Sequence, residues 1–262
     1  FCVIAALPAG DVAHLDALAR AALSEHGEAF SVTASCGSAL LPADARTPSE
    51  ALGIADRRMY AEKGSGSRAS AAHQSAEVLL QVLCERSSHL GTYLDDVTEL
   101  CGAVGGALAV PEEEMSHLLR AASLHDIGNA AIPEALLDKP GPLDEHEWAY
   151  IRSHTLIGER ILAAAPALAP AAKLVRSSHE RFDGGGYPDG LAGEQIPLGA
   201  RIIAACAAFY AMTARRPHRS PMSVECAQAE LRAGAGTQFD ATVVDALMEV
   251  LRDRVMQADG VA

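Results

Sequence analysis

The sequence has no long apolar run and no basic leader. Its longest apolar stretches, at 202–214 and 161–172, fall short of the ~20 residues that a membrane-spanning helix needs. No basic segment of the kind that begins a signal peptide precedes the first apolar residues. The sequence therefore predicts a cytoplasmic protein without a membrane span. The start at Phe1 instead of Met suggests a piece of a longer chain.

Paired cysteines and an excess of positive charge are also missing. The six cysteines, at 2, 36, 84, 101, 206 and 226, form no Cys-x-x-Cys pair, which is typical of a reduced cytosolic protein. The 34 acidic residues outnumber the 21 basic ones, and the formal net charge is −13. This charge disfavours nonspecific binding to nucleic acid polymers and anionic membranes, so an anionic ligand would need metal ions or a local basic cluster.

The composition that is present, 49% hydrophobic and 21% charged over 262 residues, is typical of a globular chain with a real core. The first 68 residues have mixed patterns, with strands expected over 1–7 and 31–41 and helices over 11–26 and 48–63. The Gly-Ser-Gly-Ser sequence that follows is expected to end the second helix and to mark a domain boundary at residue 68.

From residue 69 onward the pattern is helical. We expect a linker helix over 69–88, a helical domain over 89–255 and a C-terminal tail over 256–262. The glycine-rich loop over 183–193 lies between helices. The expected helices cover 73–86, 89–109, 111–126, 142–154, 155–164, 166–179, 200–214 and about 240–253.

Histidine and aspartate recur at the ends of these helices. The apolar stripe of the helix over 111–126 continues into His125, with Asp126 beside it. A buried imidazole beside a carboxylate must be hydrogen-bonded or bind metal, and a hydrogen-bonded core pair is the simpler alternative. His154 and His179 lie on later helices. Helical bundles build metal sites from such side chains on separate helices, and these ligands suit Mn, Fe, Zn or in principle Ni.

Five motifs accompany these residues: His179-Glu180-Arg181-Phe182-Asp183-Gly184-Gly185-Gly186-Tyr187-Pro188-Asp189-Gly190-Leu191, Leu124-His125-Asp126-Ile127-Gly128, Ile132-Pro133, Lys139-Pro140-Gly141 and Ile196-Pro197-Leu198. Together they resemble the HD-GYP family over about residues 86–255. This family is an all-helical branch of the HD phosphohydrolases, and its members typically hydrolyse cyclic di-GMP at a centre of two or three metals.

The resemblance implies metal-binding roles for four residues. His125 and Asp126 match the pair that gives the family its name, and they would act in catalysis with Asp126 bridging the metals. His154 matches the histidine on the following helix, and His179 matches the second of two adjacent histidines. The implied cofactor is one or two divalent ions, of Fe, Mn or a similar metal.

Substrate contacts are implied for Tyr187, Arg216 and Arg219. Tyr187 belongs to the Gly-Tyr-Pro triplet, and the two arginines match basic residues that hold phosphates, a task that guanidinium groups suit. Without the resemblance, the basic cluster would be a solvated loop. The implied reaction is attack of a metal-activated hydroxide on phosphorus, with departure of the ribose oxygen. The implied ligand is cyclic di-GMP, and further candidate partners are GGDEF or other signalling proteins and a second copy of the chain.

Two ligand positions of the family are changed. The upstream histidine is Tyr93 and the downstream aspartate is Ala207. Alanine cannot bind metal, and a neutral tyrosine with a pKa near ~10 is a poor ligand. We therefore expect the metal site that His125 completes to be depleted, while Asp126 and the two later histidines keep enough ligands for one metal.

Lesser departures are Ser178 for the first of the adjacent histidines, Asn129 for a lysine and Tyr210 for an aspartate. His89 lies one helical turn before Tyr93 and is a candidate replacement ligand, or equally a surface residue. His117 and His146 lie among acidic residues, and both are expected at the surface.

The first 68 residues resemble the C-terminal half of a GGDEF domain. The resemblance rests on Ala55-Asp56-Arg57-Arg58-Met59-Tyr60-Ala61-Glu62-Lys63 and the preceding Thr33-Ala34-Ser35-Cys36-Gly37. The Gly-Gly-Asp-Glu loop that would carry catalysis is not in the sequence. We therefore expect an inactive regulatory or interaction module.

The expected fold class is mainly α: an all-helical HD-GYP domain after a truncated α/β GGDEF-like module. The first functional hypothesis is a metal-dependent cyclic di-GMP phosphodiesterase, impaired by Tyr93 and Ala207. The second is a catalytically inactive module that binds cyclic di-GMP or a protein partner. A phosphohydrolase acting on another nucleotide is the third, since HD folds host many substrates.

Overall fold

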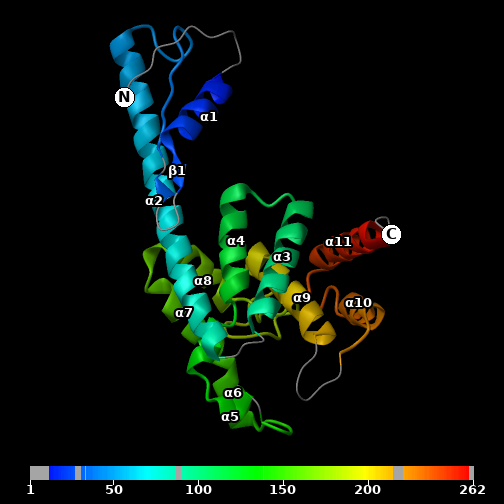
Figure 1. The fold of residues 1–262 in the computed structure, drawn as a ribbon. Coiled ribbons are helices and arrows are strands. Elements are labelled where there is room, and N and C mark those ends of the chain that lie inside the picture. The colour runs from blue at the N-terminus through cyan, green and yellow to red at the C-terminus, as the bar shows by residue number, and fades with distance from the viewer. Residues whose placement is uncertain are drawn as a thin grey trace. The chain divides into compact units, whose positions relative to one another are not determined.

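The computed structural model describes residues 12–26, 31–32, 34–86, 90–137, 139–214 and 221–259. The chain divides into two compact units, Phe1–Ala71 and Ala72–Ala262. Most of the described residues lie in helices, so the mainly α fold class is confirmed at this level (Figure 1). None of the described helices is long and apolar enough to cross a membrane.

The first unit contains little β structure in its described part. Helix α1 (Val12–Leu23) is followed by β1 (Glu25–His26) and β2 (Ser31–Val32), which pair antiparallel. The strand predicted over 31–41 is wrong over 34–41, and the strand predicted over 1–7 lies outside the described residues. The Ser38 carbonyl accepts a hydrogen bond from Arg58 of helix α2 (Pro48–Arg86) at 2.8 Å, and not from a strand partner. These short strands do not support the truncated α/β GGDEF-like module.

Helix α2 (Pro48–Arg86) corrects the predicted helix end at residue 63. It begins as expected, with the Thr47 hydroxyl accepting a hydrogen bond from the Glu50 amide (3.3 Å). It then continues through 64–67, where the sequence predicted a break. Glycine and serine lower helix propensity but keep their backbone N–H groups, so four such residues between two helical patterns do not end the hydrogen-bond ladder as proline would.

The described part of the second unit is mainly helical, with the glycine-rich loop over 183–193 between helices. Its core includes the fully buried Leu94, Leu118, Leu124, Ile202 and Ile203, and helices α3, α4, α8 and α9 pack around it. Its α-helices after α2 are α3 (Leu90–Ala107), α4 (Glu112–Leu124), α5 (Glu134–Leu137), α6 (Glu145–Arg152), α7 (His154–Ala163), α8 (Ala169–Arg176), α9 (Leu198–Thr213), α10 (Val224–Ala233) and α11 (Ala241–Asp259). Three 3₁₀ segments, η1 (Ile127–Ala131), η2 (Pro166–Leu168) and η3 (Gly193–Gln195), connect some of them.

Several predicted bounds differ from the observed ones. The helix predicted over 111–126 ends at Leu124, and the one predicted over 166–179 ends at Arg176. In both cases the chain turns just before a histidine of the candidate site. Helix α10 was not predicted, although Ser223 caps it by accepting a hydrogen bond from the Cys226 amide (3.2 Å).

A close backbone contact joins η1 to the start of α7. A Cβ atom at Gly128 would lie 1.8 Å from the His154 carbonyl oxygen and 2.9 Å from the Gly158 nitrogen. Both neighbours are backbone atoms, so no side chain could move aside to make room. Only glycine at 128 allows η1 to approach α7 this closely.

We expect Gly128→Ala to lower the free energy of unfolding by about 3 kcal/mol, because the new methyl group forces apart two packed backbone segments. Gly106→Ala is the matched control, since a Cβ at this exposed position of α3 meets nothing within 4 Å. The control is expected to be neutral or slightly stabilising. Urea unfolding followed by circular dichroism measures both, and equal midpoints would contradict the contact.

Candidate metal centre

Asp126 lies where α4 ends and the chain turns into η1. The preceding His125 is buried, at 2% exposure, and its Nδ1 lies 2.8 Å from the Ala122 carbonyl oxygen. A carbonyl oxygen only accepts, so Nδ1 carries the hydrogen and Nε2 faces Asp126, whose Oδ2 is 3.3 Å away. The side-chain amide of Asn129 donates to the other oxygen of Asp126, Oδ1 (3.0 Å). The carboxylate is therefore held from two sides.

His154 is the first residue of α7 and is 3% exposed. Its Nδ1 donates to the Ile151 carbonyl oxygen at 2.8 Å, which fixes the ring and leaves Nε2 with the free lone pair. This buried Nε2 has no hydrogen-bond partner among the described residues. Its distance of 3.9 Å to Asp126 Oδ1 is too long for a hydrogen bond.

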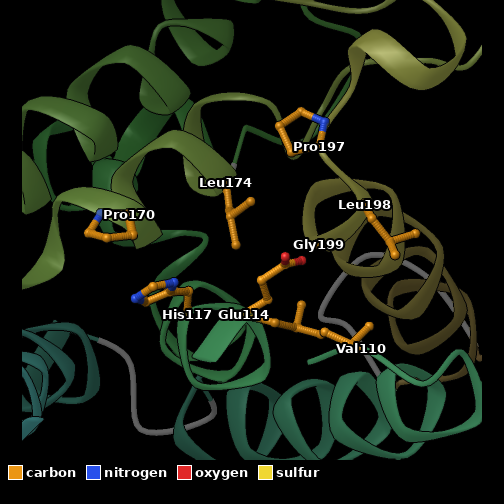
Figure 2. Close-up of a pocket in the computed structure, with 9 residues that line it drawn as sticks. Val110, Glu114, His117, Pro170, Leu174, Pro197, Leu198 and Gly199 are labelled. Carbon is orange, nitrogen blue, oxygen red and sulfur yellow. The ribbon is translucent and has the colours of Figure 1, made fainter. Parts of the chain in front are cut away.

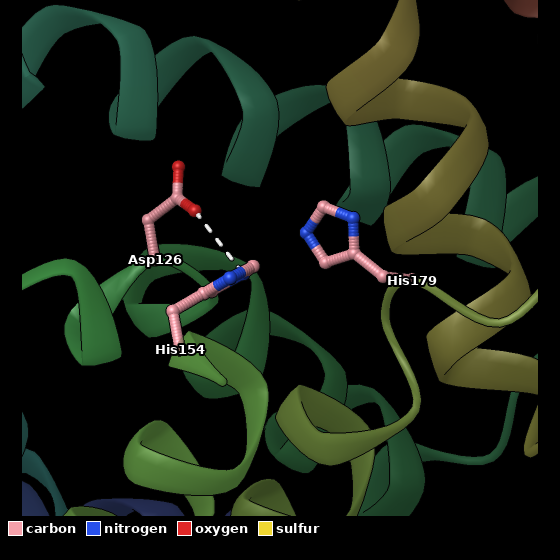
Figure 3. A group of neighbouring side chains, drawn as sticks. All are labelled: Asp126, His154 and His179. Carbon is pink, nitrogen blue, oxygen red and sulfur yellow. Dashed lines mark ion pairs between the residues drawn. The ribbon is translucent and has the colours of Figure 1, made fainter. Parts of the chain in front are cut away.

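His179 completes a cluster with Asp126 and His154. It follows α8, and its ring meets the His154 ring edge to face, with centroids 4.7 Å apart. One ligand atom from each of the three residues lies within 4.8 Å of the other two. Figure 3 shows the three side chains converging, and its dashed line marks the pair of His154 and Asp126.

These three residues fit a divalent metal. Two imidazoles and one carboxylate are donors that Mn, Fe and Zn accept in proteins. The buried Nε2 of His154 would cost free energy without a partner, and a metal would supply one. The hydrogen bond from Nδ1 to a backbone carbonyl is the usual way in which a metal-binding histidine is oriented.

The electrostatics of the cluster favour the metal-binding forms of Asp126 and His179. Burial raises the pKa of Asp126, but the charges of the nearby histidines outweigh it and hold the pKa well below its usual range. Burial, together with repulsion from His154, lowers the pKa of His179 to about 4. Burial also lowers the pKa of His125, but attraction to Asp126 more than compensates and raises it overall. At neutral pH, His179 therefore has a lone pair free and Asp126 is ionised.

Tyr187 lies against the cluster from the glycine-rich loop. Its ring stacks on His179, with centroids 5.1 Å apart and an interplanar angle of 14°. Burial, followed by the charge of Asp126, raises the pKa of Tyr187 to about 12. The phenol is therefore neutral at physiological pH and can donate a hydrogen bond.

The glycine-rich loop is held in place by buried Glu180, which is 4% exposed. Its carboxylate accepts hydrogen bonds from the backbone amides of Asp189 (2.7 Å), Gly190 (3.1 Å) and Leu191 (3.1 Å). Arg176 adds two hydrogen bonds to the Asp189 carboxylate, at 2.6 and 2.7 Å. Charge-assisted bonds of this kind are among the stronger ones in proteins, and they fix the loop that carries Tyr187.

Other predicted site residues lie outside the cluster or outside the described residues. Tyr93 and Ala207 are half-buried against the core, and the Tyr93 ring centroid is 6.0 Å from that of His125. Arg216, Arg219 and His89 lie outside the described residues, so their predicted roles stay predictions.

A separate pocket involves one of the two histidines expected at the surface. His117 is half-buried and lines this pocket together with Glu114, Leu174 and Leu198 (Figure 2). His146, by contrast, is exposed as expected. The pocket contains none of the residues of the metal-binding cluster.

Comparison with known proteins places this geometry in a family. A family model described as "HD domain" matches residues 77–243, more than half of the chain. The chain belongs to the HD domain family. HD domain phosphohydrolases depend on metal ions, in agreement with the cluster of Asp126, His154 and His179.

Several curated relatives share this domain. The cyclic di-GMP phosphodiesterase response regulator RpfG of Xanthomonas campestris is 39% identical over 165 residues, which cover 62% of this chain and 44% of the relative. A 3′3′-cGAMP-specific phosphodiesterase of Vibrio cholerae is 34% identical, covering 63% of this chain and 32% of the relative. A cyclic di-GMP phosphodiesterase of Thermotoga maritima is 34% identical, covering 67% and 48%. The chain thus spans less than half the length of each of these three relatives.

A solved structure shares the fold of the HD domain. It is described as an HDG"Y"P protein from Bdellovibrio bacteriovorus, and it matches with a TM-score of 0.52 at 17% identity. The match covers 62% of this chain and 52% of the other. At this identity the likeness bears on the fold alone, and it confirms the helical HD fold expected from the sequence.

Sequence reasoning missed three residues around the cluster of the HD domain. Glu180 holds the loop, while Arg152 and Trp148 extend the stack of rings that begins at His179. Trp148 and Arg152 are spaced i, i+4 on α6, which could have indicated a contact on one helix face. Their approach to Tyr187 depends on the tertiary fold and has no signal in the sequence.

We expect His154→Ala to weaken Mn²⁺ binding at least ~10-fold, since loss of even an outer-shell partner of a metal site costs this much. His146→Ala is the matched control, because His146 is an exposed histidine of α6. Its Mn²⁺ affinity should equal that of the unchanged chain. Isothermal titration with Mn²⁺ and metal analysis of the dialysed proteins give both values. An unchanged affinity in His154→Ala would show that the metal lies elsewhere.

Proposed function

We propose that the chain is an HD-GYP phosphodiesterase that hydrolyses cyclic di-GMP with one or two divalent ions, at a reduced rate. The single observation that carries the proposal is the cluster of Asp126, His154 and His179, in which the buried Nε2 of His154 has no hydrogen-bond partner among the described residues. The names of the relatives support the substrate class, because they include cyclic di-GMP and cGAMP phosphodiesterases. Fe and Mn are the metals that we favour.

The residues of the chain would act in distinct ways. His154 and His179 bind the metal as neutral imidazoles, and Asp126 binds it as an ionised carboxylate that His125 and Asn129 orient. A bound divalent ion supplies a Lewis acid and a more acidic water for attack on phosphorus. Tyr187 donates a hydrogen bond to the dinucleotide as a neutral phenol. Arg216 and Arg219 hold its phosphates in the proposal.

The reduced rate follows from the second metal site. Tyr93 and Ala207 pack against the core, at positions where the family pattern has a histidine and an aspartate. His125 and Asp126 alone would then hold the second ion. A catalytically inactive module that binds cyclic di-GMP is the alternative that this same observation favours.

The first unit carries a second, separate proposal. We infer from its sequence motifs that it is a remnant of a GGDEF domain with a regulatory or interaction role. Protein partners of the GGDEF or other signalling type, a homodimer and a cytoplasmic location belong to the same proposal. Pull-down of the chain with and without residues 1–71 would test it, and equal recovery of partners would contradict it.

We expect Asp126→Ala to lower cyclic di-GMP hydrolysis at least ~100-fold, because the carboxylate is the only anionic ligand of the cluster. Asp245→Ala, at an exposed position of α11, is the matched control and should keep the full rate. Product formation with Mn²⁺ is followed by liquid chromatography. Tight binding without turnover in the unchanged chain would favour the inactive module, and turnover that survives in Asp126→Ala would exclude this cluster as the catalytic centre.

We expect the double variant Tyr93→His with Ala207→Asp to raise the bound metal and the rate of hydrolysis. It returns two ligands to helices α3 and α9, which pack against each other. Tyr93→His with Ala208→Asp is the matched control, because it adds the same charge one residue further along α9. Metal analysis compares the two variants. Equal metal content would mean that the ligand positions are wrongly aligned with the family pattern.

A further inference from the structure

A stack of planar groups leads from the metal-binding cluster to the protein surface. His154, His179 and Tyr187 form its inner part, through the edge-to-face and stacked contacts described above. The guanidinium carbon of Arg152 lies 5.4 Å from the centroid of the Tyr187 ring. It also lies 5.8 Å from the centroid of Trp148. Arg152 thus sits between two aromatic faces at the outer end of the stack.

Arg152 differs from the other arginines near the loop in having no acidic partner. Arg176 is neutralised by Glu159 and Asp189, and Arg181 by Asp183. No carboxylate of the described residues pairs with Arg152, and its side chain is exposed. The five N–H donors of its guanidinium are therefore open to a ligand. In a chain with a net charge of −13, such an open arginine beside a candidate metal centre is notable.

The helix that carries Arg152 is held firmly. Asp144 and Glu147 form a reciprocal capping box at the start of α6, with hydrogen bonds of 2.9 and 2.8 Å. Lys139 adds contacts of 2.6 and 2.7 Å to the Glu147 carboxylate. Arg152 is the last residue of this helix, two residues before His154. Its backbone position is therefore tied to that of a metal ligand.

We propose that Arg152 binds a phosphate of the dinucleotide and that Trp148 and Tyr187 hold its guanidinium in place for this contact. The proposal rests on the proposed function and adds a binding residue to the same site. Guanidinium groups bind phosphate through paired hydrogen bonds. Contact with two aromatic faces restricts the side chain without using its N–H donors, which lie in the guanidinium plane.

The test compares the affinity for cyclic di-GMP of Mn²⁺-loaded variants by isothermal titration calorimetry. Arg152→Gln is expected to weaken binding ~10-fold or more, as loss of a charge-assisted contact does. Arg152→Lys keeps the positive charge but loses the paired N–H donors of the guanidinium. Its affinity for cyclic di-GMP should therefore lie between those of the unchanged chain and of Arg152→Gln. Trp148→Ala should weaken binding about two- to fivefold, since an exposed cation–π contact is a small effect. Arg232→Gln, at an exposed position of α10, is the matched control with the same charge change and no expected effect.

Two readouts separate a binding role from a structural one. Arg152→Gln should keep the metal content and the melting temperature of the unchanged chain, and its binding should depend less on salt because one ionic contact is lost. Affinity equal to that of Arg232→Gln would overturn the proposal. So would a loss of affinity that is matched by loss of metal.

The outcome also distinguishes this proposal from the proposed function. If the chain binds and hydrolyses cyclic di-GMP but Arg152→Gln behaves like the control, the function stands and the role of Arg152 fails. If the chain does not bind cyclic di-GMP, the proposed function fails, and inorganic phosphate becomes the probe of Arg152. Phosphate binding that is at least ~3-fold weaker in Arg152→Gln than in Arg232→Gln would then support the role of Arg152. Equal phosphate binding would overturn it.

Discussion

The site depends on one close contact between backbones, at Gly128 and His154. Without a side chain at 128, η1 lies directly against the first residue of α7. This contact brings Asp126, which lies between α4 and η1, next to His154. The two ligands come from segments that are far apart in sequence, so no local propensity could align them. The absence of a side chain at Gly128 therefore allows both the packing of η1 on α7 and the approach of Asp126 to His154.

A second constraint acts on the opposite side of the cluster. The buried carboxylate of Glu180 accepts hydrogen bonds from three backbone amides of the loop. These bonds offset the free-energy cost of removing the carboxylate from water. His179 is the residue just before Glu180, and Tyr187 lies in the loop that these hydrogen bonds hold in place. One buried side chain thus fixes a candidate metal ligand and an aromatic neighbour together. This explains why the loop tolerates several glycines and still presents Tyr187 in a defined stack with His179.

Sequence reasoning predicted the parts of the fold that depend on short-range patterns. Helical periodicity gave the helices of the second unit, and the His-Asp motifs gave the residues that the structure brings together at Asp126, His154 and His179. It failed at residues 64–67, where context on both sides overrode local propensity, and at 34–41, where no strand forms and the Ser38 carbonyl instead accepts a hydrogen bond from Arg58 of α2. It also missed Arg152, whose place in the stack depends on how α6 meets the loop over 183–193, a contact between distant segments.

The number of carboxylates in the cluster bears on how much metal it can hold. Asp126 is the only anionic ligand of the group of three, and the imidazoles are neutral when they bind metal. One divalent ion would leave the cluster with a net charge of +1, which attracts a phosphate. A second ion would raise this charge to +3 without a further carboxylate, because the position of the family aspartate is Ala207. Repulsion between two close divalent ions at low dielectric is severe. Under the proposed function, we therefore expect Ala207 to lower the affinity for a second ion, while a first ion would still attract an anionic ligand.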